Sequence, residues 1–582
     1  MMTAPSTNAD TDGDAHARGA AETRAPDAQG RDSVLSTRTR TGETADCPRH
    51  ADNAADAEPF NPPRRLVSPA IGERVFAGTM DRTVAWTALH PQIEDLEALR
   101  TVGDPLADDA LDALLAARAI SSVPMHDLVS ALRDANAAIN AHDTTSPHMQ
   151  LALHHQVAIR AMWAHITTVP AWVDWTRVTA GQDFYYQHAT AMAWILAMGS
   201  LLTVYTAASI GAVLDATAYL TGHGKGDDRV VARRIVETGH MINLAMWSVD
   251  ALRPGGDGWA SVVNVRFLHA LVRRRVLAKA KAGTYSVALH GVPVNQEDMA
   301  FTGLSFVAIV LMGLERLGFI SGITTPGTNP PNLAKGIDGY VHAWAYIQYL
   351  SGIRDDINPY IPPSAAAKIA EEARAVGLAG AGALAPPAIE DPGADTYAHL
   401  LRVMDATGYH LYSPNATAHA LAAALLNGIR YVPPTYLPNR TSRTVARLLL
   451  GDRATTDLGV PTTSDADVAA ARRTVRFVFR PLVAVWRYVP VLRPIMRKAL
   501  MYLHMRAMQE LVLRPASAKG TEFVFHTGNG GEMEGSAAVC PFASVAAGKT
   551  VEKEHGVSAV MAIGLGVVVA AVAVGVAAVW RV

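Results

Sequence analysis

One run without a charged side chain, FYYQHATAMAWILAMGSLLTVYTAASIGAVL at residues 184–214, bears most directly on the fold. It is long and apolar enough to be mistaken for a membrane span. Its glutamine, histidine, serines and threonines, together with its glycines, favour two helices buried in a large all-α core. We therefore predict core helices here, with a membrane span as the alternative.

Helical patterns continue after this run. Residues 230–252 keep a 3.6-residue apolar period until RPGGDG ends it, and residues 259–283 form a helix that becomes basic in its second half. Asn295 is a predicted N-cap, because carboxylates follow it in the first turn of an apolar segment. Residues 336–353 predict a further, aromatic-rich helix. No sustained alternation of Val, Ile and Thr indicates a sheet, so the expected fold class is all-α.

Composition excludes several classes of function. The 582 residues contain 51 basic and 53 acidic side chains, so no overall field attracts the chain to nucleic acid or to anionic lipid. Two cysteines exclude a disulfide scaffold and a four-cysteine metal site, and they fit a reducing compartment. We expect no nucleic-acid partner.

The chain divides into four regions by composition. Residues 1–58 contain almost no large aliphatic side chains and are expected to be a disordered arm without a signal peptide. A folded body is expected at 59–515 and a Gly-rich linker at 516–556. Residues 557–580 carry no charge and are long enough to cross a bilayer. We predict a single-pass C-terminal anchor with a cytosolic body; a buried terminal helix is the alternative.

His269 is the first candidate site residue, in VRFLHALVRRR at residues 265–275. At 3.6 residues per turn its helix face is shared by valines, with Arg266 and Arg273 along one margin. The valines on this face are Val262, Val265, Val272 and Val276. They leave a flat apolar slot beside an imidazole that could ligate iron, with cations near enough to meet haem propionates. The alternative is a core histidine that is hydrogen-bonded to a backbone carbonyl.

Arg234 and Thr238 form the second candidate pair. They are four residues apart and lie on one helix face. A permanently charged donor beside a hydroxyl is suited to polarising a bound oxygen species. Alternatively, Arg234 forms a surface ion pair with Glu237.

Several stretches carry a family resemblance, among them VARRIVETGHMI, PGGDGWASVVNVRFLHALVRRRVL and GVPVNQEDMAFTGLSFVAIVLMGLERLG. Over about residues 104–362 the chain resembles the rubber oxygenase (latex-clearing protein) and MpaB-type ER-bound oxygenase family. The resemblance implies a globin-like helical core that encloses a b-type haem. It also implies an enzyme that uses dioxygen to cleave carbon–carbon double bonds of isoprenoid chains, and it suggests the endoplasmic reticulum.

The resemblance also assigns roles to single residues. The family's iron-ligating histidine corresponds to His269 in its Arg-x-x-His helix, and the distal arginine and threonine correspond to Arg234 and Thr238. Glu237 stands where a basic residue can occur in the rubber-cleaving members. We expect the apolar olefin to lie in a channel that is lined by Met241, Trp247 and the helices of residues 184–214.

Two other functions stay open. An enzyme of this fold could carry out a different haem reaction, such as hydroxylation or peroxidation. A haem-free helical scaffold at a membrane would use His269 and Arg234 only for structure. For residues 364–513 the sequence predicts packed α-helices but assigns no function to them.

Overall fold

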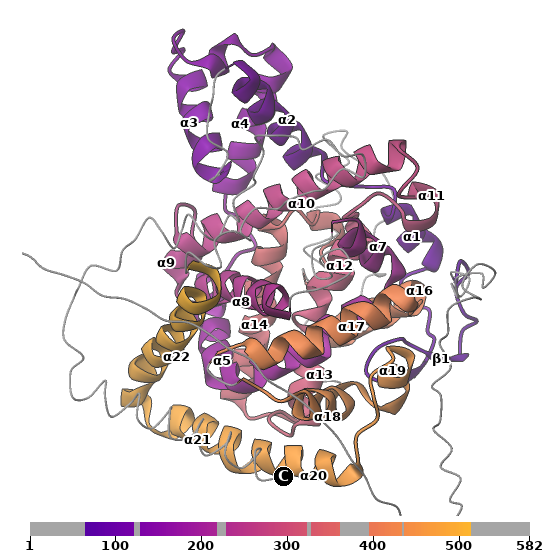
Figure 1. Cartoon of the computed structure of the whole chain (residues 1–582). Helices are drawn as coiled ribbons and strands as arrows, with labels where there is room; N and C mark the ends of the chain where they lie inside the picture. The colour runs from indigo at the N-terminus through magenta and orange to yellow at the C-terminus, as the bar shows by residue number, and fades with distance from the viewer. Residues whose placement is uncertain are drawn as a thin grey trace, which may run out of the picture. The chain divides into compact units, whose positions relative to one another are not determined.

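The computed structural model describes residues 65–120, 128–217, 228–322, 328–360, 395–433 and 436–513, and these segments are mostly helical (Figure 1). The all-α prediction is therefore confirmed. The predicted arm, linker and membrane anchor at 1–58, 516–556 and 557–580 lie outside the described residues. The globin-like arrangement around a haem stays a prediction.

One small sheet was not predicted. Strand β1 (Arg74–Phe76) pairs antiparallel with β2 (Thr83–Ala85), and Arg74 lies opposite Ala85. Each strand has three residues, so neither is long enough to produce a recognisable alternation of apolar and polar residues. The turn between them needs left-handed backbone at Gly78, Met80 and Asp81.

The first four helices are α1 (Ile93–Leu99), α2 (Pro105–Ile120), α3 (Leu128–Asn140) and α4 (Leu153–Thr167). Helix α1 packs against α12 (Gln296–Ser305) and α16 (Asp395–Leu411), whereas α2 to α4 form a separate group that contacts the body through α2 and α3. Helices α2, α3 and α4 pack on one another, and α2 also packs against α10 (Asp257–Lys281). Their contacts bury Leu111, Leu114 and Leu132.

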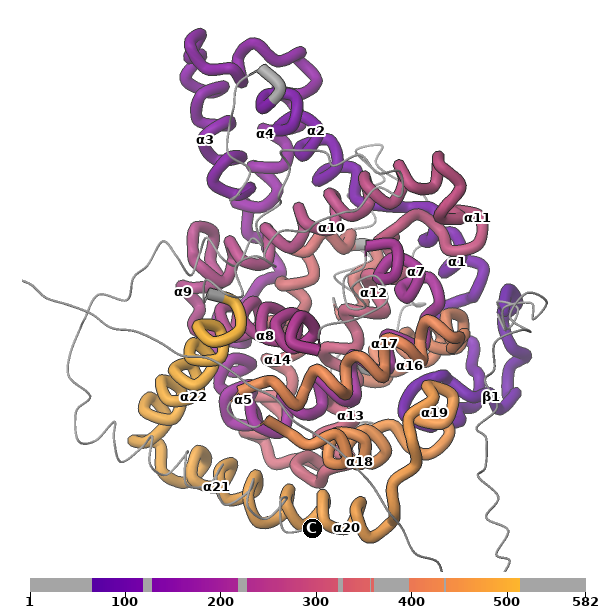
Figure 2. The backbone as a smooth tube through the Cα atoms, viewed as in Figure 1, coloured from indigo at the N-terminus to yellow at the C-terminus, as the bar shows by residue number. Residues whose placement is uncertain are grey.

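The charge-free run lies in the core, as predicted. Helix α5 (Trp175–Ile195) continues through a π-helical turn, η2 (Leu196–Ser200), into α6 (Leu201–Tyr205), and α7 (Ala208–Ala216) follows. The long helix α14 (Pro331–Leu350) lies beside α5 (Figure 2). A Cβ on Gly181 would overlap the carbonyl oxygen of Gly339, so the close approach of these two helices requires glycine on both.

The helices that carry the candidate residues follow the expected segments with one interruption. Residues 230–252 form α8 (Asp228–Ala245) and a separate turn, α9 (Val249–Leu252), because the Ser248 side chain accepts a hydrogen bond from the Ala251 N–H and starts a new helix. Asn295 caps α12 as predicted. The remaining helices of this region are α11 (Val287–His290), α12 (Gln296–Ser305) and α13 (Ala308–Arg316).

The C-terminal part is helical, as expected, and packs on the same core. Figures 1 and 2 show its last helices, α20 to α22, along one side of the helical body. The elements are α16 (Asp395–Leu411), α17 (Ala416–Gly428), α18 (Asn439–Leu450), α19 (Asp452–Asp457), α20 (Asp465–Thr474), η5 (Val475–Phe479), α21 (Arg480–Tyr488), α22 (Arg493–Met508) and η7 (Gln509–Leu513). Short 3₁₀ turns join several of them.

Among the described residues, two helical stretches reach the length and hydropathy of a membrane span, Trp175–Tyr205 and Gln296–Arg316. The most apolar windows of these stretches are 67% and 89% buried by other parts of the chain, respectively. Helices of this composition also form the cores of soluble proteins. Their burial agrees with the prediction of core helices at 184–214.

Candidate active site

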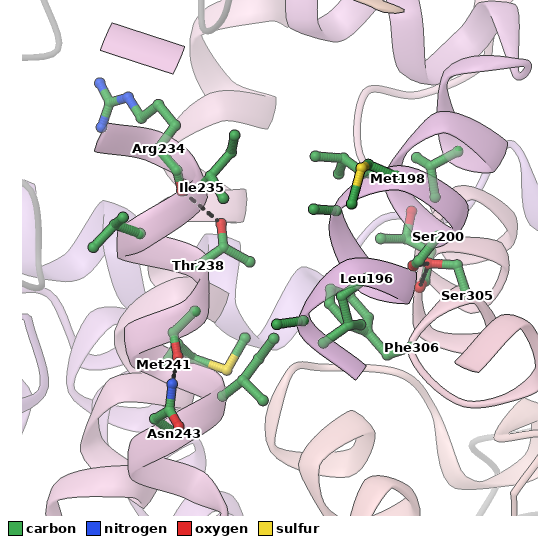
Figure 3. A pocket seen from close by; sticks show the side chains of 18 of the residues that line it. Leu196, Met198, Ser200, Arg234, Ile235, Thr238, Met241, Asn243, Ser305 and Phe306 are labelled. Carbon is green, nitrogen blue, oxygen red and sulfur yellow. Dashed lines mark hydrogen bonds between the residues drawn. The ribbon is translucent and has the colours of Figure 1, made fainter. Parts of the chain in front are cut away.

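A cavity of about 620 Å³ lies within the helical body, and apolar side chains make up most of its wall. This volume is within the range of about 300–1,000 Å³ that is usual for small-molecule sites. Helices α5 to α8, α10, α12 and α14 contribute to the wall, together with η5, α21 and α22. Figure 3 shows two of its sides, with Thr238 and Met241 facing Leu196 and Met198. The cavity therefore brings together segments that are distant in the sequence.

His269 lies on this wall together with Val265 and Val272. Two of the valines predicted to share its face, Val262 and Val276, are buried in the core. The His269 Nδ1 atom is buried and has no hydrogen-bond partner among the described residues. Nε2 makes no hydrogen bond in that part of the chain, yet it is not among the buried atoms without a partner. Nε2 is therefore the ring nitrogen that the cavity reaches.

The His269 imidazole is neutral at physiological pH. Burial, reinforced by the positive charge of Arg273, lowers its pKa to about 4. A neutral imidazole keeps the lone pair that a metal needs. The alternative of a hydrogen-bonded core histidine finds no support within the described ranges.

Arg234 and Thr238 lie on the same wall, on α8. The Thr238 hydroxyl donates a hydrogen bond of 3.0 Å to the backbone carbonyl of Arg234 (Figure 3). In this arrangement Thr238 presents an acceptor oxygen to the cavity, because its only proton is used within the helix. In Figure 3 the Arg234 guanidinium points away from Met198 and Ser200, which lie across the cavity.

Glu237 lies between two arginines. Its carboxylate accepts a hydrogen bond of 2.8 Å from Arg234 Nη1 and one of 2.9 Å from Arg233 Nε. The pair between Arg234 and Glu237 that the sequence suggested for the helix surface therefore exists, but it is buried, with 7% and 1% of the two side chains exposed. Glu237 itself is not on the cavity wall.

Arg266 and Arg273 do not line the cavity. Arg266 donates two hydrogen bonds, of 2.6 and 3.0 Å, to the carboxylate of Asp104. Arg273 pairs with Asp108 at 2.5 Å and also donates to the carbonyls of Pro293 and Val294. Burial alone would raise the pKa of Asp104, but Arg266 outweighs this effect and holds the pKa below its usual value. Both arginines thus fasten α10, the helix of His269, to the start of α2.

Met241 and the helices of residues 184–214 line the cavity as predicted, but Trp247 does not. Its ring packs against Tyr186 at a centroid distance of 6.1 Å. Trp247 lies beyond the end of α8 at Ala245, and even in a continued helix it would lie about 120° around the axis from Met241, because the two residues are six apart.

Two wall residues were not found from the sequence. Asp298 was recognised only as a first-turn carboxylate, yet it lines the cavity and accepts hydrogen bonds from Ser209 and Asn295. Burial raises its pKa to about 7. His504 of α22 also lines the cavity, and its Nε2 lies 3.2 Å from Nδ1 of His240 on α8. No local pattern signals a contact across 264 residues.

Comparison of the chain with known proteins identifies a family whose matched segment contains most of the cavity. The family model described as "ER-bound oxygenase mpaB/B'/Rubber oxygenase, catalytic domain" matches residues 185–480. The match overlaps the predicted span of 104–362, starts later and extends further toward the C-terminus. No curated protein matched. A solved structure entitled "Structure of Latex Clearing Protein LCP in the closed state" aligns with 17% identity and a TM-score of 0.42, over 70% of this chain and 91% of that one.

The matched segment holds the cavity residues of α5 to α14 and spans just over half of the chain. The recognition made from the sequence motifs is confirmed. The chain is an enzyme of the oxygenase class and belongs to the ER-bound oxygenase mpaB/B'/rubber oxygenase family.

Proposed function

We propose that this enzyme is a haem-dependent oxygenase that cleaves carbon–carbon double bonds of an apolar, isoprenoid-like chain, with His269 as the axial ligand of a b-type haem. Membership of the oxygenase family supports the reaction class. The mostly apolar wall of the cavity supports an apolar substrate. Dioxygen is the expected co-substrate, and we expect no nucleic-acid partner.

The observation that carries the proposal is the state of His269. A buried imidazole without hydrogen bonds costs stability on the order of 1–3 kcal/mol, so such a group is uncommon unless it has another use. Here the reachable nitrogen, Nε2, is neutral and lies on the cavity wall. Bonding to iron would use the lone pair of Nε2, whereas Nδ1 would remain the buried ring nitrogen without a hydrogen-bond partner among the described residues, and Val265 and Val272 would pack against a flat ring. The residues present therefore fit a haem.

Arg266 and Arg273 then have a different role from the one predicted. Because both guanidinium groups are already paired, with Asp104 and Asp108, we assign them to positioning α10 rather than to contact with haem propionates. Arg234 lines the wall, but its guanidinium is paired with Glu237 and extends away from Met198 and Ser200 (Figure 3). We therefore propose that Arg234 acts on a negative group of the cofactor or of bound oxygen through its charge rather than by direct contact.

When bound, haem supplies a redox-active iron that activates dioxygen. The chain's own contribution is to hold donors where negative charge develops and to keep water out. Thr238 can donate toward the cavity if its hydroxyl turns from the Arg234 carbonyl, a rotation about one bond. Arg234 keeps its orientation through Glu237, which also neutralises part of its charge.

That neutralisation is the observation in favour of the second candidate, a different haem oxidation such as hydroxylation or peroxidation. A guanidinium paired with a buried carboxylate polarises a bound ligand less than a free one. We also propose that residues 557–580 anchor the enzyme in a membrane, where an apolar substrate would be concentrated.

The test is the absorption spectrum of the full chain expressed with haem supplied. We expect a strong Soret band that is lost in His269→Ala and returns when imidazole is added, because free imidazole can replace the missing ligand. His504→Ala is the matched control, since it removes the other imidazole on the wall, and it should keep the band. A native protein that folds without binding haem would contradict the proposal. Product analysis with olefinic substrates then separates cleavage from hydroxylation.

A further inference from the structure

The outer side of the last helices is unlike the rest of the described surface. Helix α20, the π-turn η5 and α21 form one continuous helical run, Asp465 to Tyr488, and α22 follows after a short turn. The inner side of these helices closes the cavity with Val478, Phe479, Leu482 and Leu503. The opposite side therefore lies one helix thickness away from the apolar interior.

Arginines form a stripe on that outer side. Arg473, Arg476, Arg480 and Arg487 are three, four and seven residues apart, so they share one helix face, and all four are exposed. No acidic residue occurs between Asp467 and Glu510, whereas this segment contains nine arginines and lysines. The charge here is positive in a chain whose net charge is -2.

Large apolar side chains accompany the arginines. Phe477, Tyr488, Val491 and Tyr502 are 66%, 73%, 76% and 52% exposed, respectively. Single exposed apolar side chains are ordinary on a soluble protein. Five of the thirteen large exposed hydrophobic residues in the described ranges, however, lie between 477 and 502. We call the four arginines and these four apolar residues the α21 surface.

We propose that the α21 surface binds an anionic lipid membrane. Arginines recognise phosphate groups, and exposed aromatic and aliphatic side chains next to them can enter the boundary between headgroups and acyl chains. An acidic protein or a nucleic acid would match the arginines but would leave Phe477, Tyr488 and Val491 without an apolar partner. The charge and the apolar side chains together thus favour a bilayer.

The position of this surface strengthens the proposal. The helical segments η5, α21 and α22 have one side at the cavity and the other at the α21 surface. For example, Phe477 is exposed, whereas the next residue, Val478, lines the cavity. Docking would bring the apolar cavity next to the phase in which an apolar chain dissolves. The inference goes beyond the proposed function, because it requires neither haem nor the terminal anchor.

The experiment uses the full chain with Cys47→Ser and Cys540→Ser, and with Tyr488→Cys labelled by an environment-sensitive fluorophore. The protein is mixed with phosphatidylcholine vesicles that contain either no phosphatidylserine or about one third phosphatidylserine. We expect a blue shift, and quenching by brominated lipids, with anionic vesicles only. The control label at Leu153→Cys, a position that is 72% exposed on α4, should respond to neither. Because the label reports on its own position, an anchor elsewhere in the chain does not produce the signal.

A charge-reversal set tests the arginines. The variant Arg473→Glu, Arg476→Glu, Arg487→Glu should weaken engagement of the Tyr488 label at least about tenfold. The charge-matched variant Arg133→Glu, Lys281→Glu, Lys335→Glu, on other helices, should leave it unchanged; circular dichroism verifies that both variants fold.

Four results would overturn the proposal. The first is a label that stays in water with anionic vesicles, and the second is an equal response to neutral ones. The third is a label that is already shielded in solution, which would mean that the chain itself or a second copy covers the surface. The fourth is a response to RNA or polyglutamate but not to vesicles, which would assign the surface to another macromolecule.

Discussion

At the scale of single residues, the buried carboxylate of Glu237 is the most sensitive group near the cavity. It neutralises Arg233 and Arg234, and 1% of its side chain is exposed. We predict that Glu237→Gln lowers the free energy of unfolding by about 3 kcal/mol, because two buried guanidinium groups lose the negative charge of Glu237. Chemical denaturation of the purified chain measures this. Asp134→Asn, which breaks the exposed pair with Arg133, should cost less than about 1 kcal/mol.

Glu237→Lys extends the same argument. It places a third cation beside Arg233 and Arg234, so we expect a larger loss of stability than for Glu237→Gln. Adding Arg233→Glu reverses the pair and should recover part of the stability, because glutamate followed by lysine four residues later is the favourable order. Equal stability of Glu237→Lys and the native chain would refute this account of the site.

At the scale of helices, the contact of α5 with α14 controls the cavity, since both helices line it. A Cβ on Gly339 would overlap the backbone of Arg177 and Gly181. We predict that Gly339→Ala separates the helices, lowers the free energy of unfolding by about 3 kcal/mol or more, and reduces retention of the proposed haem. Gly211→Ala is the control, because its Cβ would meet Thr417 at 3.6 Å, an ordinary contact, and alanine favours the helix. Thermal unfolding and the haem absorbance of both variants decide the matter.

How far the sequence predicts these helices depends on how local each signal is. The capping of α12 by Asn295 and the burial of residues 184–214 follow from patterns within one segment, and both were predicted. Ser248, which ends one helix and starts another, and the three-residue strands were missed because their signals are a single side chain and a tight turn. His269 was found because valines flank it and the family motif contains it. His504 and Asp298 reach the wall only through tertiary packing, which no helical period encodes.

At the scale of the whole molecule, one buried ion network makes stability depend on pH. His410 lies 2.6 Å from Glu297 and 3.2 Å from Glu97, and it joins α16 to α12 and α1. Burial would lower the pKa of His410, but the two glutamates outweigh burial and raise it to about 9. Because the folded-state pKa exceeds the unfolded value, the stabilisation is complete below about pH 6.5 and is lost as pH rises through 9.

We therefore predict that the free energy of unfolding falls by about 3 kcal/mol between pH 6.5 and pH 10, and that His410→Gln removes this decline. Urea titrations across the pH range give the two profiles. The control is His148→Gln, a buried histidine whose pKa is lowered by burial and which should leave the alkaline part of the profile as it is. Parallel alkaline slopes for the native chain and His410→Gln would exclude the network as the cause.

The two ion pairs that join α10 to the start of α2 limit which fragments of this enzyme can be expressed separately. Asp104 and Asp108 precede the family-matched segment, which begins at residue 185, whereas Arg266 and Arg273 lie inside it. A gene fragment cut at the family boundaries would encode Arg266 and Arg273 without the carboxylates of Asp104 and Asp108, and it would remove α2 from one side of α10, the helix of His269. We therefore expect the family-matched segment alone to be less stable than the full chain. Its first helices are part of the oxygenase, and domain exchange with a relative would have to include them.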